Sequence, residues 1–287
     1  MARQNVGGIE IDYEFFGDER SPVVILTPGG RYPRDTPGLP QLAAVLVEGG
    51  YRVLSWDRPN CGASDISFEG VSESALHADT LVGLTEALGL RRFALVGGSA
   101  GSRISLMAAA RAPERVSKLF IWWISGGPIS LAQLASYYCA DAAVAASRGG
   151  MEAVAALPGF ADQIARNPRN RELILQWDPD AFIARMQLWA EGYAYSRTSP
   201  VPGISADQFT RMTMPAIVLR SGKSDLSHTR EASEQTAALL PNAQLVEPPW
   251  PDQEWNNCSK IPNEPGRGRF ERWPLLAPMI LEFLGRP

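Results

Sequence analysis

Short runs of apolar, β-branched residues alternate with longer amphipathic stretches over the first half of the chain. This alternation is typical of successive strand–helix units on a mostly parallel sheet that helices cover on both faces. Gly49-Gly50, Gly89 and Pro113 mark the ends of the predicted helices, and Ser72 is a suitable cap for the second. The predicted strands are 23–26, 51–56, 93–96 and 119–124, and the predicted helices are 40–48, 72–88 and 100–112.

The pattern changes after the fourth predicted strand. Residues 126–213 contain helical stretches, such as 151–157 and 180–191, but no convincing strand. Strand and helix signals then return at 216–219, 230–240 and 243–246, followed by a polar loop over 248–269 and a last helix over 274–284. We therefore predict an α/β fold with two parts. The core comprises residues 1–125 and 214–287, and residues 126–213 form a helical lid over the carboxyl ends of the strands.

Composition narrows the classes of partner. Of 287 residues, 45% are hydrophobic and 20% charged, as in ordinary globular proteins, and the net charge of −4 disfavours nucleic acid and anionic membranes as partners. We see no signal peptide and no membrane-spanning run. Cys61, Cys139 and Cys258 are odd in number and scattered, which favours reduced thiols in a cytoplasmic protein. No metal-ligand spacing and no cofactor motif is found, so we expect neither a metal nor a cofactor. The oligomeric state stays open.

The segment Gly97-Gly98-Ser99-Ala100-Gly101 lies directly between a predicted strand and a predicted helix. In a Gly-x-Ser-x-Gly turn the serine takes a strained conformation at a helix N-terminus, where small neighbours avoid clashes and free amides face a developing oxyanion. The alternative is the glycine-rich turn of a nucleotide-binding fold. It is disfavoured because no Gly-x-Gly-x-x-Gly follows the first strand. Ser99 is therefore the candidate nucleophile.

Several segments resemble the α/β-hydrolase superfamily over nearly the whole chain. Residues 57–65, Asp-Arg-Pro-Asn-Cys-Gly-Ala-Ser-Asp, are similar to its Asp-x-Pro-Gly-x-Gly-x-Ser-Asp loop, with Asn60 at a position suited to a left-handed backbone. Pro28-Gly29-Gly30 resembles its His-Gly-x oxyanion loop. The resemblance implies that the amides of Gly30 and Ala100 form an oxyanion hole. Arg31, at its rim, is either an exposed loop residue or a group that grips a substrate carboxylate or carbonyl.

The acid and the base of the expected triad differ in how well they match the family. Asp225 follows the strand at 216–219 within Ser221-Gly222-Lys223-Ser224-Asp225, which resembles the family's Gly-x-x-Asp. The alternative role for Asp225 is to help start the helix near Thr229. The family's histidine belongs in the loop after the last strand, but residues 247–255 contain none. The resemblance therefore leaves the base unassigned.

The chain has two histidines, His77 and His228. We interpret His77 as a surface residue of its helix. His228 either makes an ordinary contact at a helix start or supplies the base from an unusual chain position, since triads are defined by geometry and not by order. If His228 is not the base, Asp252 or Glu254 occupies the vacant position, and burial would have to raise the carboxyl pKa.

These residues predict a serine hydrolase that acts on an ester, a lactone or an activated C–C bond. Two alternatives stay open: a lyase, dehydratase or cyclase with a rebuilt site, and a non-catalytic receptor for a small ligand. Tryptophans at the predicted strand ends, in the lid and in the last loop indicate a small apolar or aromatic substrate. Among the candidate binding residues are Trp123, Trp250 and Glu254; the other tryptophans expected to converge on the pocket mouth are Trp122, Trp177, Trp189 and Trp255.

Overall fold

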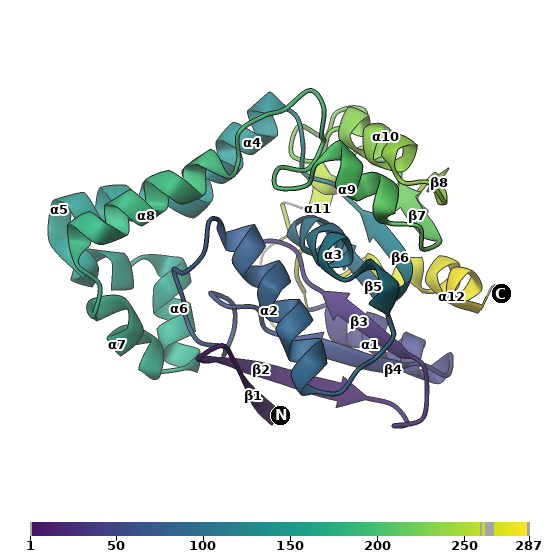
Figure 1. Ribbon diagram of the computed structural model, residues 1–287, viewed down its shortest axis with the longest axis horizontal. Coiled ribbons are helices and arrows are strands. Elements are labelled where there is room, and N and C mark those ends of the chain that lie inside the picture. The colour runs from purple at the N-terminus through teal and green to yellow at the C-terminus, as the bar shows by residue number, and fades with distance from the viewer. Residues whose placement is uncertain (1, 259, 262–266, 286–287) are drawn as a thin grey trace.

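The computed structural model describes residues 2–258, 260–261 and 267–285. Its centre is one eight-stranded sheet with the strand order β1-β2-β4-β3-β5-β6-β7-β8 (Figure 1). β2 pairs antiparallel with β1 and with β4, and all other neighbours are parallel. The strands are β1 (Ala2–Val6), β2 (Ile9–Phe16), β3 (Val23–Thr27), β4 (Arg52–Trp56), β5 (Phe93–Gly98), β6 (Val116–Trp122), β7 (Ala216–Leu219) and β8 (Ala243–Val246). The predicted fold class is thus confirmed.

Helices cover both faces of the sheet because both faces of its parallel strands are apolar. Side chains alternate along each strand. Ile25 and Leu95 therefore pack on one face with α2 and α3, while Val24 and Val96 pack on the other face with α1 and α12. The core helices are α1 (Leu39–Glu48), α2 (Glu73–Ala87), α3 (Ala100–Arg111), α10 (Arg230–Leu239) and α12 (Ala277–Gly285), with short helical turns at η1 (Pro113–Arg115), α11 (Glu254–Cys258) and η3 (Trp273–Leu276). Ser72 caps α2 by accepting a hydrogen bond from the Ala75 amide.

Residues 126–213, all of which the structure describes, contain helices and no strand between β6 and β7. They form α4 (Pro128–Ala135), the π-helical turn η2 (Ser136–Ala140), α5 (Asp141–Ala155), α6 (Pro158–Arg166), α7 (Arg169–Leu175), α8 (Pro179–Glu191) and α9 (Ala206–Arg211). In Figure 1, α5–α8 lie beside the core rather than on a face of the sheet. A separate apolar cluster holds them together, and Phe68 from the core packs edge-on against three of its rings. Their function as a lid stays a prediction.

One element was not predicted, and two local expectations were wrong. The hairpin of β1 and β2 was not predicted, although its turn is Gly7-Gly8, with both residues at positive φ. The loop expected over 248–269 contains the short helix α11; its residues 259 and 262–266 lie outside the described part. His77, expected on the surface, is 3% exposed, and its Nε2 lies 2.7 Å from the Pro59 carbonyl oxygen.

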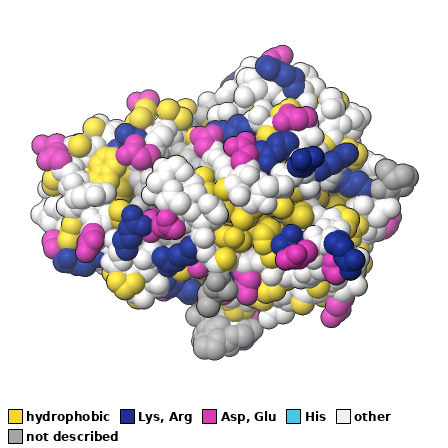
Figure 2. All heavy atoms as spheres, turned by 60° about the horizontal axis from the view of Figure 1, so that its bottom comes forward, with side chains coloured by type: hydrophobic (Ala, Val, Ile, Leu, Met, Phe, Trp, Pro, Cys, Tyr) yellow, Lys and Arg dark blue, Asp and Glu magenta, His cyan; other side chains and the backbone are white. Residues whose placement is uncertain are grey.

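The outer surface carries mixed charge. Figure 2 shows Lys and Arg interspersed with Asp and Glu around an apolar patch, with no histidine on that face. Among the described residues, no helix is long and apolar enough to cross a membrane.

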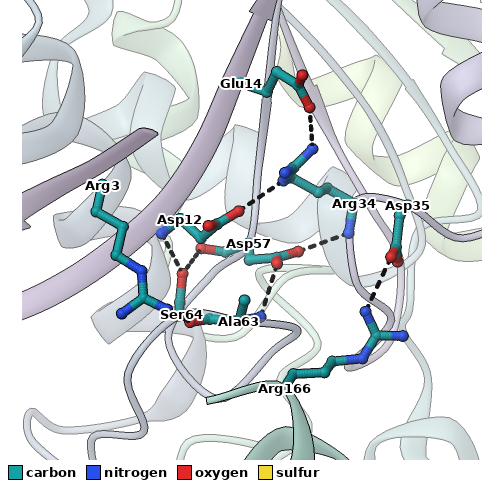
Figure 3. Close-up of polar contacts among 9 residues, drawn as sticks. All are labelled: Arg3, Asp12, Glu14, Arg34, Asp35, Asp57, Ala63, Ser64 and Arg166. Carbon is teal, nitrogen blue, oxygen red and sulfur yellow. Dashed lines mark hydrogen bonds and ion pairs between the residues drawn. The ribbon is translucent and has the colours of Figure 1, made fainter. Parts of the chain in front are cut away.

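A buried ion network fastens the loop after β3 to β2 and to the loop after β4 (Figure 3). Arg34 donates to Asp12 and Glu14, at 2.9 and 2.7 Å. The Asp57 carboxylate accepts from two backbone amides, those of Arg34 at 2.7 Å and Ala63 at 2.9 Å. Despite these bonds, burial raises the pKa of Asp57 to about 6.

This shift predicts a pH-dependent contribution to stability. Because the pKa of Asp57 is higher in the folded chain than in the unfolded one, the folded state binds more proton between about pH 4 and 6. The contribution of Asp57 to the free energy of unfolding is therefore present at low pH and lost as pH rises through 6. The loss is about 1.4 kcal/mol for each unit by which the folded pKa exceeds the unfolded one. Urea unfolding of the wild type and Asp57→Asn at pH 4.5 and 7 measures it. We expect the wild type to lose stability relative to the variant as pH rises. A constant difference would contradict the assignment.

Candidate active site

Ser99 lies at a tight turn between β5 and α3. Its φ of 58° and ψ of −122° are strained for a non-glycine residue, as predicted for a nucleophile elbow. The neighbouring glycines are required sterically. A Cβ at Gly98 would overlap the Trp122 ring, and one at Gly101 would overlap the Thr27 carbonyl oxygen. The turn therefore presents the Ser99 hydroxyl at the carboxyl edge of the sheet, where α3 begins.

The structure brings Ser99, His228 and Asp225 into one hydrogen-bonded series. His228 Nε2 lies 2.9 Å from Ser99 Oγ, and His228 Nδ1 lies 3.1 Å from Asp225 Oδ2. Because a carboxylate only accepts, Nδ1 carries the proton and donates to Asp225. Nε2 is then the acceptor for the Ser99 hydroxyl proton. All three side chains are buried.

Asp225 also fixes the backbone of this loop. Its Oδ1 accepts hydrogen bonds from the Ser227 amide at 2.9 Å and the His228 amide at 2.8 Å. The carboxylate therefore orients the His228 ring and shapes the turn that enters α10. The two roles considered for Asp225, orienting an imidazole and starting a helix, coexist.

His228 lies in the loop after β7, whereas the sequence comparison led us to expect the histidine in the loop after β8. The two loops are in direct contact, because a Cβ at Gly222 would overlap the Asp252 backbone carbonyl. Arg230 joins them further by donating to the Ser221 carbonyl and the Asp252 carboxylate. From the other side, Ser130 in α4 donates to the Ser227 carbonyl at 2.6 Å.

Two tryptophans that contact each other also contact the His228 ring. Trp123 stacks on it with centroids 5.9 Å apart and an interplanar angle of 18°, and Trp255 meets it edge-on at 4.3 Å. Trp123 directly follows β6 and has a φ of 51°, a conformation rare for a bulky residue. These contacts restrict rotation of the imidazole, so that Nε2 stays directed at Ser99 Oγ.

Ser99 and His228 open onto a cavity of about 250 Å³. Its wall combines aromatic rings with hydroxyl and amide groups and one arginine. The lining residues are Gly30, Tyr32, Ser99, Ser125, Ser130, Gln133, Leu134, Tyr137, Tyr138, Ser227, His228, Trp255, Arg269 and Phe270.

Backbone donors for an oxyanion lie next to Ser99. Ala100 is the first residue of α3, so its amide has no acceptor within its own helix. Gly29 packs so closely on Ser99 that an added Cβ would lie 3.1 Å from the Ser99 Cβ, and Gly30 lines the cavity with a φ of 47°. The assignment of Gly30 and Ala100 as the oxyanion hole stays a prediction.

Comparison with known proteins agrees with this fold. A family model described as the alpha/beta hydrolase fold matches residues 23–124. An enol-lactonase from Burkholderia xenovorans superposes with a TM-score of 0.62 at 21% identity, covering 99% of this chain and 100% of that one. An alpha/beta hydrolase enzyme from a Medee basin deep-sea metagenome library gives 0.63 at 18% identity, covering 100% and 98%. The chain therefore has the α/β-hydrolase fold.

Sequence similarity to curated hydrolases is local. The chain is 33% identical over 115 residues to a 2-hydroxy-6-oxononadienedioate/2-hydroxy-6-oxononatrienedioate hydrolase of Klebsiella pneumoniae, which is 40% of either protein. It is 36% identical over 76 residues to a 2-hydroxy-6-oxo-6-phenylhexa-2,4-dienoate hydrolase of Comamonas testosteroni, 26% of this chain and 27% of that one. The match thus spans well under two thirds of these relatives.

The two carboxylates considered as alternative bases lie away from Ser99. Glu254 is buried but accepts from Arg272 at 2.6 Å, and Asp252 pairs with Arg230 at 2.7 Å. Neither lines the cavity of Ser99. Burial raises the pKa of Glu254, yet its partner is an arginine and not a serine. The structure therefore does not bring Glu254, a candidate binding residue, to the site.

Arg31 is not exposed, so that reading of it was wrong, and it does not line the Ser99 cavity; its role in gripping a substrate stays a prediction. Its guanidinium pairs with the buried Glu73 at 2.8 Å and donates to the Tyr138 carbonyl at 3.2 Å. It lines a neighbouring cavity of about 390 Å³ with Tyr32 and Tyr137, which face both cavities. Arg31 therefore fastens the loop of Gly30 to α2 and η2.

The tryptophans do not all converge on the pocket. Trp255 lines it, but Trp123 and Trp250 do not. Trp123 contacts both the His228 ring and the Trp250 ring. Trp122 packs against Trp273 in the core. Trp177 and Trp189 contact Phe68 in the separate apolar cluster of residues 126–213, away from Ser99. The expectation that Trp122, Trp177 and Trp189 lie at the pocket mouth was therefore wrong, because they pack in apolar clusters instead.

Other chemistry-bearing groups do not form a second centre. Among the described residues, no cluster of His, Cys, Asp and Glu could hold a metal. Cys61, Cys139 and Cys258 are free and buried, and burial raises the pKa of each thiol to about 12, which keeps them protonated and unreactive.

Several residues that line the cavity, notably Tyr138 and Arg269, were not predicted from the sequence. Tyr138 carried one signal, its place in the predicted lid. Nothing in the spacing of Arg269 distinguishes it from the other arginines of its loop.

Proposed function

We propose that this chain is a serine hydrolase in which Ser99 is the nucleophile, His228 the general base and Asp225 the residue that orients the imidazole. The observation that carries the proposal is the position of His228, which bridges Asp225 Oδ2 and Ser99 Oγ. This is the geometry of a catalytic triad, in which the role of each residue follows from distance and not from chain order.

The chemistry follows from those contacts. As Ser99 Oγ attacks a carbonyl carbon, its proton passes to His228 Nε2, and the imidazolium is stabilised by Asp225. The tetrahedral oxyanion is held by the amides of Gly30 and Ala100. His228 then returns the proton to the leaving oxygen or carbon, and the acyl group stays on Ser99. Water, activated by the same imidazole, releases the acid and restores the serine.

We propose a small, partly aromatic substrate with a cleavable ester, lactone or activated C–C bond. A cavity of about 250 Å³ has room only for a small molecule, and Tyr32, Trp255 and Phe270 offer it ring faces. The printed names of the similar proteins, which include hydrolases of 2-hydroxy-6-oxo-dienoates and an enol-lactonase, support this range of bonds.

We further propose that residues 126–213 act as a lid. Ser130, Gln133, Leu134 and Tyr138 from this span supply part of the cavity wall above Ser99. The buried, free cysteines support a reducing, cytoplasmic location for the enzyme.

Burst kinetics with an activated aryl ester such as 4-nitrophenyl acetate test this function. We expect release of close to one equivalent of 4-nitrophenol per protein before the steady state, because acylation of Ser99 precedes deacylation. The Ser99→Ala variant, with an unchanged fold by circular dichroism, serves as the control and should give no burst. A burst of equal size in Ser99→Ala would refute the proposal.

A further inference from the structure

Tyr138 occupies an irregular turn in the wall of the active-site cavity. α4, η2 and α5 follow one another without a break, and η2 is a single π-helical turn that contains Tyr138 at its centre. Such turns are rare and concentrate at functional sites because the extra residue redirects a side chain. Here the Tyr138 side chain lines the cavity of Ser99, and its backbone carbonyl accepts from Arg31.

The Tyr138 hydroxyl faces the oxyanion loop. It lies 4.0 Å from the point where a Cβ on Gly30 would sit, and both residues line the cavity with Ser99. Among the described residues, none forms a hydrogen bond with this hydroxyl; the contacts of Tyr138 use its carbonyl and its ring. Tyr138 is only 4% exposed, so a polar group is held in the cavity without a protein partner.

The ring is held firmly where it is. The Arg31 guanidinium lies 5.0 Å from its centroid, and the Tyr193 ring stacks on it at 6.0 Å with an interplanar angle of 9°. Arg31 is itself paired with Glu73. The hydroxyl is thus preorganised, and a preorganised donor costs little reorganisation in the reaction.

Arg103 lies against the Tyr193 ring that stacks on Tyr138. Arg103, in α3 one turn after Ser99, is buried, and its Nε and Nη1 have no hydrogen-bond partner; its guanidinium lies 5.1 Å from the Tyr193 ring centroid. Burial, the dominant effect, raises the pKa of Tyr138, although Arg103 lowers it, so the phenol stays protonated at neutral pH. A neutral phenol donates a hydrogen bond and does not act as a base.

We propose that Tyr138 is a catalytic residue whose hydroxyl donates a hydrogen bond to the substrate oxygen that becomes the oxyanion beside Gly30. This inference rests on the proposed hydrolase function and adds a side-chain donor to the amides of Gly30 and Ala100. The proton stays on Tyr138, so the donor stabilises the developing charge without entering the proton transfer between Ser99 and His228.

The test compares Tyr138→Phe with the control Tyr195→Phe, using 4-nitrophenyl acetate; Tyr195 is exposed and does not line the cavity of Ser99. Phenylalanine keeps the ring that stacks on Tyr193 and under Arg31, so Tyr138→Phe should fold as the wild type does, which thermal unfolding checks. Loss of one oxyanion donor costs about 10²-fold or more in kcat. We expect that loss in Tyr138→Phe with KM within a factor of about three, since the bond strengthens only in the transition state. Tyr195→Phe should retain wild-type values.

Inhibition by phenylboronic acid, whose tetrahedral adduct with Ser99 mimics the intermediate, separates a donor from a merely structural residue. Tyr138→Phe should raise the inhibition constant by the same factor by which it lowers kcat/KM. Wild-type kcat in Tyr138→Phe, or a change in KM alone, would overturn the inference about Tyr138. The hydrolase proposal would still stand as long as turnover depended on Ser99. Turnover that does not depend on Ser99 would instead overturn the hydrolase proposal, and this inference with it.

Discussion

Replacing Ser99 with alanine is expected to lower kcat toward an activated aryl ester by about 10⁶-fold, the scale seen when the nucleophile of a triad is removed. The reason is geometric. Ser99 Oγ is the group that His228 Nε2 contacts at 2.9 Å, and no cysteine thiol is available to replace it, since all three are buried and protonated. Steady-state hydrolysis of 4-nitrophenyl acetate measures the loss.

The control for this variant is a serine of the same cavity that makes no contact with His228. Ser125 lines the cavity and has a small, buried side chain like that of Ser99. Ser125→Ala should retain kcat within about tenfold. If Ser99→Ala kept full activity on the natural substrate, covalent catalysis would be excluded and the site would act by polarisation and proton transfer alone.

Replacing His228 with alanine is expected to cost about as much as replacing Ser99, on the order of 10⁶-fold in kcat, because residues of a triad act as a unit. The loss should exceed the 10²–10⁴-fold typical of an isolated general base, since Asp225 would also lose its partner. Combining Ser99→Ala with His228→Ala should lower the rate no further. Steady-state kinetics of the two single variants and the double variant measure this.

The matched controls are the two carboxylates that a sequence argument places near the base position. Asp252→Asn and Glu254→Gln disturb ion pairs with Arg230 and Arg272 and no bond to Ser99. Both variants should keep kcat within about tenfold. A loss in Glu254→Gln comparable to that in His228→Ala, with the fold intact, would move the base from the imidazole to the carboxylate.

The elbow was predictable because local constraints determine it. A strand, a serine at positive φ and a helix must follow one another within a few residues, and the glycines around Ser99 are needed to avoid overlap with Trp122 and Thr27. The same reasoning holds for Asn60, whose φ of 62° matches the left-handed position expected of it.

The histidine was harder to predict because its role depends on two loops meeting in space. The three-residue spacing from Asp225 is visible in the sequence, and the Asp225 carboxylate uses it to bind both the His228 amide and the ring. The 2.9 Å contact with Ser99 joins residues 129 positions apart. No local pattern distinguishes such a histidine from one that only begins a helix.

Side-chain directions in residues 126–213 were beyond sequence reasoning. The position of Tyr138 depends on a π-helical turn, whose extra residue shifts the helical phase and which the sequence pattern did not indicate. Trp177 and Trp189 were expected near the pocket, but they pack with Phe68 because the helices there form an apolar cluster of their own. His77 was misjudged because the loop between β4 and α2 folds back over it and places the Pro59 carbonyl oxygen 2.7 Å from its Nε2.

Labelling by a fluorophosphonate tests most directly whether His228 activates Ser99. The reagent phosphonylates a serine in proportion to its nucleophilicity and needs no knowledge of the natural substrate. Wild type and Glu254→Gln should be labelled at equal rates, with peptide mapping by mass spectrometry locating the adduct on Ser99. His228→Ala should be labelled at least about 10²-fold more slowly. Equal labelling of Ser99 in His228→Ala, or an adduct on another residue of the wild type, would contradict this account of the site.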